Sequence, residues 1–494
     1  MEKLDLLKQS YNELPYVSKG FSHTLPERQR AILSLLGFKT PNIEQAKVLE
    51  IGCGFGGNII SSALIHPNAH FVGVDLSDKQ IEGGKAIVNY LGLKNVELLC
   101  QDISSFENST IKFDYIVCHG VFSWVPESVR RKILAVIKSH LSENGAATIS
   151  YNTYPGWKSV EALKDMMKFR VDLLSKQNIH LSMREKVAYG KGCAEFLSQF
   201  ALGGDKRMKD LADGIKDKDE HYIYHEYFEE YNQPLYLYEF NELLEEYGLA
   251  HICDSSVSAT FPIFKDDRIE ALLNNECGNN HLLKEQYYDY ILNRQFRTSI
   301  VTHLENREKC NISRHIQIED LNKIYIRSNL NTESSSKVVQ ALKESYPNAI
   351  NVSDFIEHYF ADKRNEGYKS VLLEIYNENI DFYARNIEVT KRDKIKLKTV
   401  YRKYLDYYLN TENPVISLSN FVGNTLLLNS GDLQVILSFD GLHTDEELVD
   451  VLLEKVQAGI LTINNAHSIP EQKAVLLTFI KDTRAFIEAN LMNE

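Results

Sequence analysis

The chain has 494 residues, a length that corresponds to about three domains. Hydrophobic residues make up 44% of it and charged residues 25%, the balance of an ordinary globular protein. The net charge of −13 disfavours a protein that holds nucleic acid through phosphate contacts. We expect no insertion into a membrane, because no apolar stretch reaches about 18 residues.

The cysteines and the first residues give two further expectations. No signal-peptide pattern is visible at the beginning of the sequence, so we expect a cytoplasmic protein. The seven cysteines form no Cys-x-x-Cys pair. Their spacing predicts neither a disulfide framework nor a structural zinc site, and we expect no metal site elsewhere.

Short β-rich runs alternate with helical patterns from Lys47 onward. The expected strands are Lys47–Ile51, His70–Leu76, Val96–Cys100, Tyr115–Cys118 and Ala146–Tyr151, with a later one at Leu249–Cys253. Strands that alternate with helices are typical of a parallel, doubly wound sheet. The sequence therefore predicts an α/β protein with such a sheet.

Changes in the pattern of predicted strands and helices along the chain indicate five segments. These are 1–157, an α/β domain; 158–232, a helical insertion; 233–265, the return of the chain to the sheet; 266–403, a helical middle domain; and 404–494, a small helix-rich C-terminal domain that loosely fits a winged helix.

A glycine cluster follows the first strand. Gly52, Gly54 and Gly57 satisfy the pattern G-x-G-x-x-G, which lets a backbone turn approach a ligand closely. This pattern alone does not choose a cofactor. Glu50 precedes it by two residues, and a carboxylate there would repel a pyrophosphate but attract a cationic ligand.

Acidic residues also end the second and third strands. Asp75 is placed to bind two ribose hydroxyls, and Asp102 follows the third strand where an adenine would lie. Their neighbours Leu76 and Ile103 are included in the predicted site. Together with the acid before the glycines, these residues predict a positively charged adenosine ligand, S-adenosyl-L-methionine. The alternative is a glycine turn in another α/β enzyme, with both aspartates as helix N-caps.

The loops after the fourth and fifth strands should face the same crevice, because ligands bind at the carboxyl ends of parallel strands. His119 could contact the cofactor or make a structural hydrogen bond, and Trp124 would form a wall. Tyr151, Asn152 and Tyr154 are the candidate catalytic residues that could orient a nucleophile. The alternative for these three is a Pro-Gly turn with packed aromatic rings.

Residues 217–246 combine acidic and aromatic side chains. This segment has ten acids, one base and six tyrosines. Carboxylates attract cations over distance, and aromatic faces hold alkylammonium groups at short range. The composition suits a lysine-bearing substrate, although a solvated acidic helix with tyrosines packed beneath it would have the same composition.

The chain resembles class I S-adenosylmethionine-dependent methyltransferases that carry a methyltransferase regulatory domain. Within them it is similar to the bacterial lysine methyltransferases of rickettsial type, which modify outer-membrane proteins. The resemblance rests on Tyr11-Asn12-Glu13-Leu14-Pro15-Tyr16 with Phe21 and His23-Thr24, and on Val48–Asn58, Phe71–Ser77, His119–Pro126, Ser150–Trp157, His225–Phe240 and Gln286–Arg297.

The resemblance implies a Rossmann-like sheet, a homodimer formed through the helical insertion, and an open cavity for a protein substrate. It also implies that Glu50, Gly52, Gly54, Asp75, Asp102 and His119 line the cofactor and that Tyr16 closes over it. The expected function is methylation of protein lysines. Two alternatives stay open: a small-molecule methyltransferase of biosynthesis, and a regulatory protein that binds the cofactor without turnover.

Overall fold

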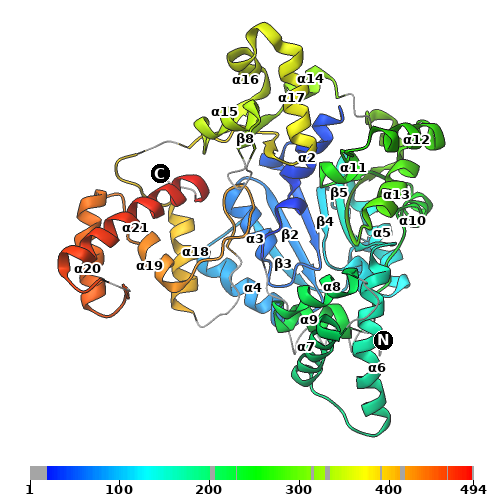
Figure 1. The fold of residues 1–494 in the computed structure, drawn as a ribbon, viewed down its shortest axis with the longest axis horizontal. Helices are drawn as coiled ribbons and strands as arrows, with labels where there is room; N and C mark the ends of the chain where they lie inside the picture. The colour runs from blue at the N-terminus through cyan, green and yellow to red at the C-terminus, as the bar shows by residue number, and fades with distance from the viewer. Residues whose placement is uncertain are drawn as a thin grey trace.

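The computed structural model describes residues 19–108, 110–200, 206–229, 231–312, 316–328, 334–389, 392–411, 418–463 and 466–491. Tyr16, which the resemblance places over the cofactor, lies outside these described residues. Figure 1 shows a central sheet from which three lobes project.

The central sheet has seven strands in the order β3-β2-β1-β4-β5-β7-β6. The strands are β1 (Lys47–Ile51), β2 (His70–Asp75), β3 (Val96–Cys100), β4 (Phe113–Cys118), β5 (Leu141–Asn152), β6 (Leu249–Asp254) and β7 (Phe296–His303). The first five strands pair in parallel, and β7 lies antiparallel between β5 and β6. This topology confirms the predicted doubly wound α/β fold.

Strand β7 differs from the prediction, which assigned 266–403 to one helical domain. Its sequence, FRTSIVTH, is buried from Arg297 to His303 although most of its side chains are polar. The sequence of such a strand shows neither an apolar run nor an alternation of apolar and polar residues. Its polar side chains can be buried because they have hydrogen-bonding partners inside the protein. Residues 281–303 therefore complete the sheet, through α13 (His281–Leu292) and β7.

Helices cover both faces of the sheet because successive strand residues point to opposite sides. Val48 packs in one hydrophobic cluster with α3 (Gly57–Ile65) and α4 (Asp78–Leu91). Leu49 packs in the other with α5 (Glu127–His140) and α10 (Leu237–Glu246). Strands buried on both faces read as near-continuous apolar runs, which is why β1 was recognisable in the sequence.

The predicted helical insertion forms the lobe at the bottom of Figure 1. It consists of α6 (Trp157–Lys176), α7 (Met183–Phe200), α8 (Lys206–Lys216) and α9 (Glu220–Phe228). The insertion has its own hydrophobic core, which includes Met167, Val187 and Ile223 and reaches Trp124 beside the sheet. The lobe is thus packed against the loop that follows β4.

The remaining two lobes are built from the later half of the chain (Figure 1). One holds α14 (Ile318–Leu321), α15 (Lys337–Ser345), α16 (Val352–Tyr359), α17 (Arg364–Tyr376) and the small sheet β10-β8-β9 (Ile380–Tyr383, Tyr325–Ser328, Ile350–Asn351); the other holds α18 (Thr399–Asn410), α19 (Ser430–Ile436), α20 (Asp445–Gln457) and α21 (Ile469–Asn490).

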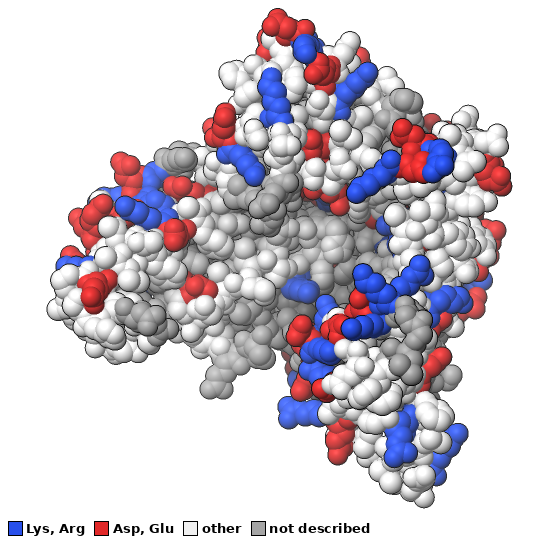
Figure 2. Space-filling model, viewed as in Figure 1, with Lys and Arg blue, Asp and Glu red and all other residues white. Residues whose placement is uncertain are grey.

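The last lobe contacts the cofactor half of the sheet. The Tyr90 hydroxyl of α4 donates to Asp406 of α18 at 2.8 Å, and the Thr425 hydroxyl donates to the Gly20 carbonyl at 2.6 Å. Figure 2 shows the face hollowed where the lobes meet, with most charged side chains out on the lobes. Within the described ranges, no helix combines the length and apolarity needed to cross a membrane.

Candidate functional site

A cavity of about 630 Å³ lies at the carboxyl ends of the parallel strands. Every predicted cofactor residue in the described part of the chain lines it: Glu50, Gly52, Gly54, Asp75, Leu76, Asp102, Ile103 and His119. The parallel strands β1 to β4 end at this edge of the sheet, so residues far apart in sequence meet there.

The glycine loop after β1 adopts a backbone that requires glycine. Gly52 and Gly54 have φ angles of +75° and +55°, in the left-handed region. A Cβ on Gly52 would clash with Val121, and one on Gly54 would lie 2.8 Å from the Gln80 side-chain oxygen. The loop therefore leaves its backbone open for a ligand to approach.

Asp75 fixes this loop. One carboxylate oxygen accepts the amide of Gly54 at 2.8 Å, and the other accepts the amide of Ser77 at 2.9 Å. Burial raises the pKa of Asp75, against the effect of these hydrogen bonds. Each oxygen has a second lone pair, so the carboxylate can also accept from the two hydroxyls of a ribose.

Glu50 has one satisfied and one unsatisfied carboxylate oxygen. Oε1 accepts the Asn58 side-chain amide at 2.9 Å, whereas Oε2 is buried and has no hydrogen-bond partner among the described residues. Burial raises the pKa of Glu50 to about 7. A buried oxygen without a partner is unfavourable, so a cationic group in the cavity would stabilise it.

A segment before α2 (Pro26–Leu35) forms a second wall, and its residues belong to the resemblance although the sequence did not predict them as site residues. Phe21 and His23 line the cavity, with ring centroids 4.3 Å and 5.0 Å from that of His119. Burial, with smaller effects of His23 and Lys19, lowers the pKa of His119 to about 3. His119 is therefore neutral, and its buried Nδ1 has no hydrogen-bond partner within the described structure.

These observations fit S-adenosyl-L-methionine. The open glycine loop and Asp75 suit the ribose, and Asp102, where the sequence predicts the adenine, lines the same cavity. Hydrogen bonds from Ser104 lower the pKa of Asp102 although partial burial opposes them, so this side chain is ionised. The unpartnered oxygen of Glu50 suits the positively charged methionine end.

The three candidate catalytic residues do not all reach the cavity. Asn152 lines it, whereas the Tyr151 ring is buried on the other face of β5 and stacks on Phe240 at 4.2 Å. The Tyr154 hydroxyl donates to Glu161 at 2.5 Å and does not line the cavity. Neighbouring strand residues point to opposite faces, so Tyr151 and Asn152 cannot both face the ligand.

A further wall of the cavity comes from the helical insertion, from the residue before β7 and from the first residue of β7. Asp219, Tyr222 and Glu226 line it from α9 and the residue before α9, together with Gln295 and Phe296. The acidic and aromatic segment identified in the sequence thus supplies three residues to the cavity. Nothing in the local sequence pattern indicated which three.

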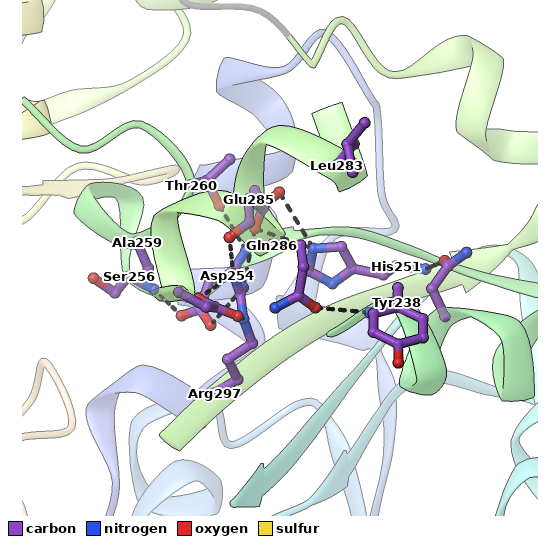
Figure 3. A network of polar contacts seen from close by, with 12 residues as sticks. Tyr238, His251, Asp254, Ser256, Ala259, Thr260, Leu283, Glu285, Gln286 and Arg297 are labelled. Atoms are coloured by element: carbon purple, nitrogen blue, oxygen red, sulfur yellow. Dashed lines mark hydrogen bonds and ion pairs between the residues drawn. The ribbon is translucent and has the colours of Figure 1, made fainter. Parts of the chain in front are cut away.

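A buried ionic network holds β7 in place (Figure 3). Arg297 is fully buried and pairs with Asp289 at 2.8 Å and Glu285 at 3.0 Å, both on α13. His251 of β6 contacts Glu285 at 3.3 Å. Because these ions are paired and hydrogen-bonded, the network fixes the chain just before Arg297, where Gln295 and Phe296 reach the cavity.

Comparisons with known proteins agree with this geometry. Residues 48–145 match the model of a methyltransferase domain, and residues 219–303 match that of a predicted methyltransferase regulatory domain. An uncharacterized protein of Rickettsia prowazekii is 33% identical over 398 residues, which cover 78% of this chain and 68% of that protein. A second one from this organism is 39% identical over 235 residues, or 48% of this chain and 93% of that protein.

A solved structure matches nearly the whole chain. The structure of PKMT2 from Rickettsia typhi in complex with AdoHcy has a TM-score of 0.84 and 25% sequence identity, and the match covers 97% of this chain and 100% of that one. The regulatory-domain match spans α9 to β7, so that region shares both the sheet and the cavity with the methyltransferase domain. The chain therefore belongs to the class I S-adenosyl-L-methionine-dependent methyltransferases that carry this regulatory domain.

Proposed function

We propose that the protein transfers methyl groups from S-adenosyl-L-methionine to lysine side chains of a protein substrate. One observation carries this proposal: Asp219, Tyr222 and Glu226 line the same cavity as Glu50 and the glycine loop. Two carboxyl groups beside an aromatic ring form a site for an alkylammonium group. The acceptor side of the cavity is therefore suited to a lysine.

The cofactor side would work mainly by orientation. When bound, S-adenosyl-L-methionine supplies an electrophilic methyl group on its sulfonium. Asp75 and the glycine loop would hold the adenosine, and Glu50 would pair with the charged methionine end. Alignment of two reactants in one cavity removes much of the entropic barrier to such a transfer.

The acceptor must present a neutral nitrogen, because an ammonium group has no free electron pair. A free lysine amine has a pKa near about 10.4, so the site must favour its neutral form. The family resemblance of the sequence supports a cytoplasmic homodimer that acts on a protein, such as an outer-membrane protein. The cavity walls support an amine acceptor independently of that resemblance.

The proposal is tested with methyl-labelled S-adenosyl-L-methionine and native cell lysate separated into protein and small-molecule fractions. Label on protein lysines, located by mass spectrometry, would support the proposal and identify the target. Label confined to small molecules would overturn it in favour of a biosynthetic methyltransferase. Cofactor binding without any labelled product would overturn it in favour of a regulatory protein. The Asp75→Ala variant serves as the control with weakened cofactor binding.

A further inference from the structure

A second cavity, of about 370 Å³, lies within the helical insertion. Its walls come from α6, α8 and α9 and from the residues before β7. Four residues line both this cavity and the cofactor cavity: Trp157, Tyr222, Glu226 and Gln295. The two spaces are thus neighbours that share one wall, and we call the second one the insertion cavity.

Glu226 stands at this shared wall with an unengaged carboxylate. Among the residues that the structure describes, its side chain has no hydrogen-bond or ion-pair partner, although it is only partly accessible. The positive charge of Lys164 on α6 acts on Glu226, but the two side chains form no ion pair in the described chain. The Lys164 Nζ is buried, has no hydrogen-bond partner among the described residues and lies 5.7 Å from the centroid of the Trp124 ring. A carboxylate so placed is available to a ligand.

We propose that the insertion cavity admits the acceptor side chain and that Glu226, in the wall shared with the cofactor cavity, binds the acceptor ammonium and takes its proton. This inference rests on the proposed amine methylation. In this proposal the acceptor enters through the helical insertion. Glu226, which lies in the match to the regulatory domain, is a catalytic residue.

The proposed step balances without any further reactant. The ammonium gives one proton to the Glu226 carboxylate, and the freed nitrogen pair then forms the N–CH₃ bond. The S–CH₃ bond breaks, and its electron pair stays on sulfur in S-adenosylhomocysteine. The carboxyl group afterwards returns its proton to water through the insertion cavity. A base at hydrogen-bond reach contributes about 10² to 10⁴-fold to such a reaction.

The charges around Glu226 suit this role. Burial raises its pKa to about 7, against the effect of Lys164, so the group can both accept and release a proton near neutrality. The other charged or titratable groups in the walls of the insertion cavity are Arg207 and Asp210 of α8, Lys218 before α9, and Tyr222 and Tyr227 of α9. Asp219, before α9, lines the cofactor cavity. Burial also lowers the pKa of Lys164 to about 8.

The first test compares Glu226→Gln with Glu220→Gln, an exposed carboxylate on the same helix. The probe is the peptide Gly-Lys-Gly with S-adenosyl-L-methionine. At saturating S-adenosyl-L-methionine, we expect Glu226→Gln to lower kcat by about 10² to 10⁴-fold, to leave cofactor affinity unchanged and to abolish the fall in kcat below about pH 7. Glu220→Gln should behave as the wild type. Equal rates and pH profiles in both variants would overturn the inference.

A second test does not depend on turnover. n-Butylammonium is titrated calorimetrically into the protein saturated with S-adenosylhomocysteine, and binding should be lost in Glu226→Gln alone. Absence of binding to the wild type, or equal binding to both proteins, would overturn the inference. Methylation of Gly-Lys-Gly by the wild type tests the proposed function separately, so the two failures are distinguishable.

The third test fills the insertion cavity without touching Glu226. Gly214 of α8 lines this cavity and has open space where a Cβ would lie; Gly192 of α7 has the same open space but does not line it. We expect Gly214→Phe to raise KM for Gly-Lys-Gly at least tenfold, roughly the effect of losing one close contact, with cofactor affinity unchanged. Gly192→Phe should have no effect. An unchanged KM in Gly214→Phe would overturn the proposal that the acceptor enters through the insertion cavity.

Discussion

Asn58 connects Glu50 to the wall formed by the N-terminal segment. Its side-chain nitrogen donates to Glu50 Oε1 at 2.9 Å and to the Thr24 hydroxyl at 3.2 Å, while its side-chain oxygen accepts the Phe21 amide at 3.0 Å. The carboxylate that faces the cofactor cavity therefore shares a hydrogen-bond network with the segment that covers it. A ligand that pairs with Glu50 acts on this network directly.

Cofactor affinity should depend on pH through Glu50. Burial raises the pKa of its carboxyl to about 7, and a cationic ligand pairs only with the ionised form. The affinity for S-adenosyl-L-methionine should therefore fall almost tenfold per pH unit below about pH 7 and level off above it. Calorimetric titrations between about pH 6 and about pH 8 measure this. The Glu50→Gln variant should bind weakly at every pH, and a pH slope that persists in it would assign the effect to another group.

Loss of the Asp75 carboxylate should remove much of the cofactor affinity. Hydrogen bonds to a charged group contribute about 1.5–3 kcal/mol, so Asp75→Ala should weaken binding of S-adenosyl-L-methionine by about 10 to 150-fold. Asp172→Ala, at an exposed site on α6, is the control. Unchanged affinity in Asp75→Ala would contradict the assignment of the ribose site.

The ion network at β7 should matter far more for stability than a surface ion pair. Removal of one partner from a buried pair costs about 3–5 kcal/mol, because the other charges stay buried. We therefore expect Arg297→Met to lower the free energy of unfolding by about that amount. Arg268→Met breaks an exposed pair with Asp266, which water screens, and should lower the free energy of unfolding far less. Denaturant titrations of both variants make the comparison; similar losses would show that the network contributes no more than a surface pair.

The cofactor residues could be predicted from sequence because their positions follow from topology. A parallel sheet brings the ends of its strands to one edge, so Glu50, Asp75 and Asp102 had to meet wherever the strands were recognised. The choice between Tyr151 and Asn152 could not be made in this way. Both are buried, and a strand covered on both faces carries no polar alternation that would show which side chain faces the ligand.

The wall formed by Phe21 and His23 depends on contacts between distant segments. Phe21 and His23 are positioned through Asn58, and the bond from Thr425 to Gly20 comes from the far end of the chain. No local pattern encodes such contacts. Strand β7 was missed for a different reason: its polar residues, Arg297 among them, are paired inside the protein, and hydrophobic periodicity does not register paired polar groups.

The glycine loop offers a test that separates backbone strain from steric access. Gly52 and Gly92 have nearly equal φ angles, +75° and +70°, so alanine at either site is strained by about 1–2 kcal/mol. A Cβ at Gly52 also meets Val121 in the cofactor cavity, whereas one at Gly92 meets nothing within 4 Å. We expect Gly52→Ala to lose more stability than Gly92→Ala, because its Cβ must displace Val121, and only Gly52→Ala to lose binding of S-adenosyl-L-methionine. Thermal unfolding and calorimetric titration measure the two effects separately. Retained binding in Gly52→Ala would show that the cofactor does not approach the backbone at this loop.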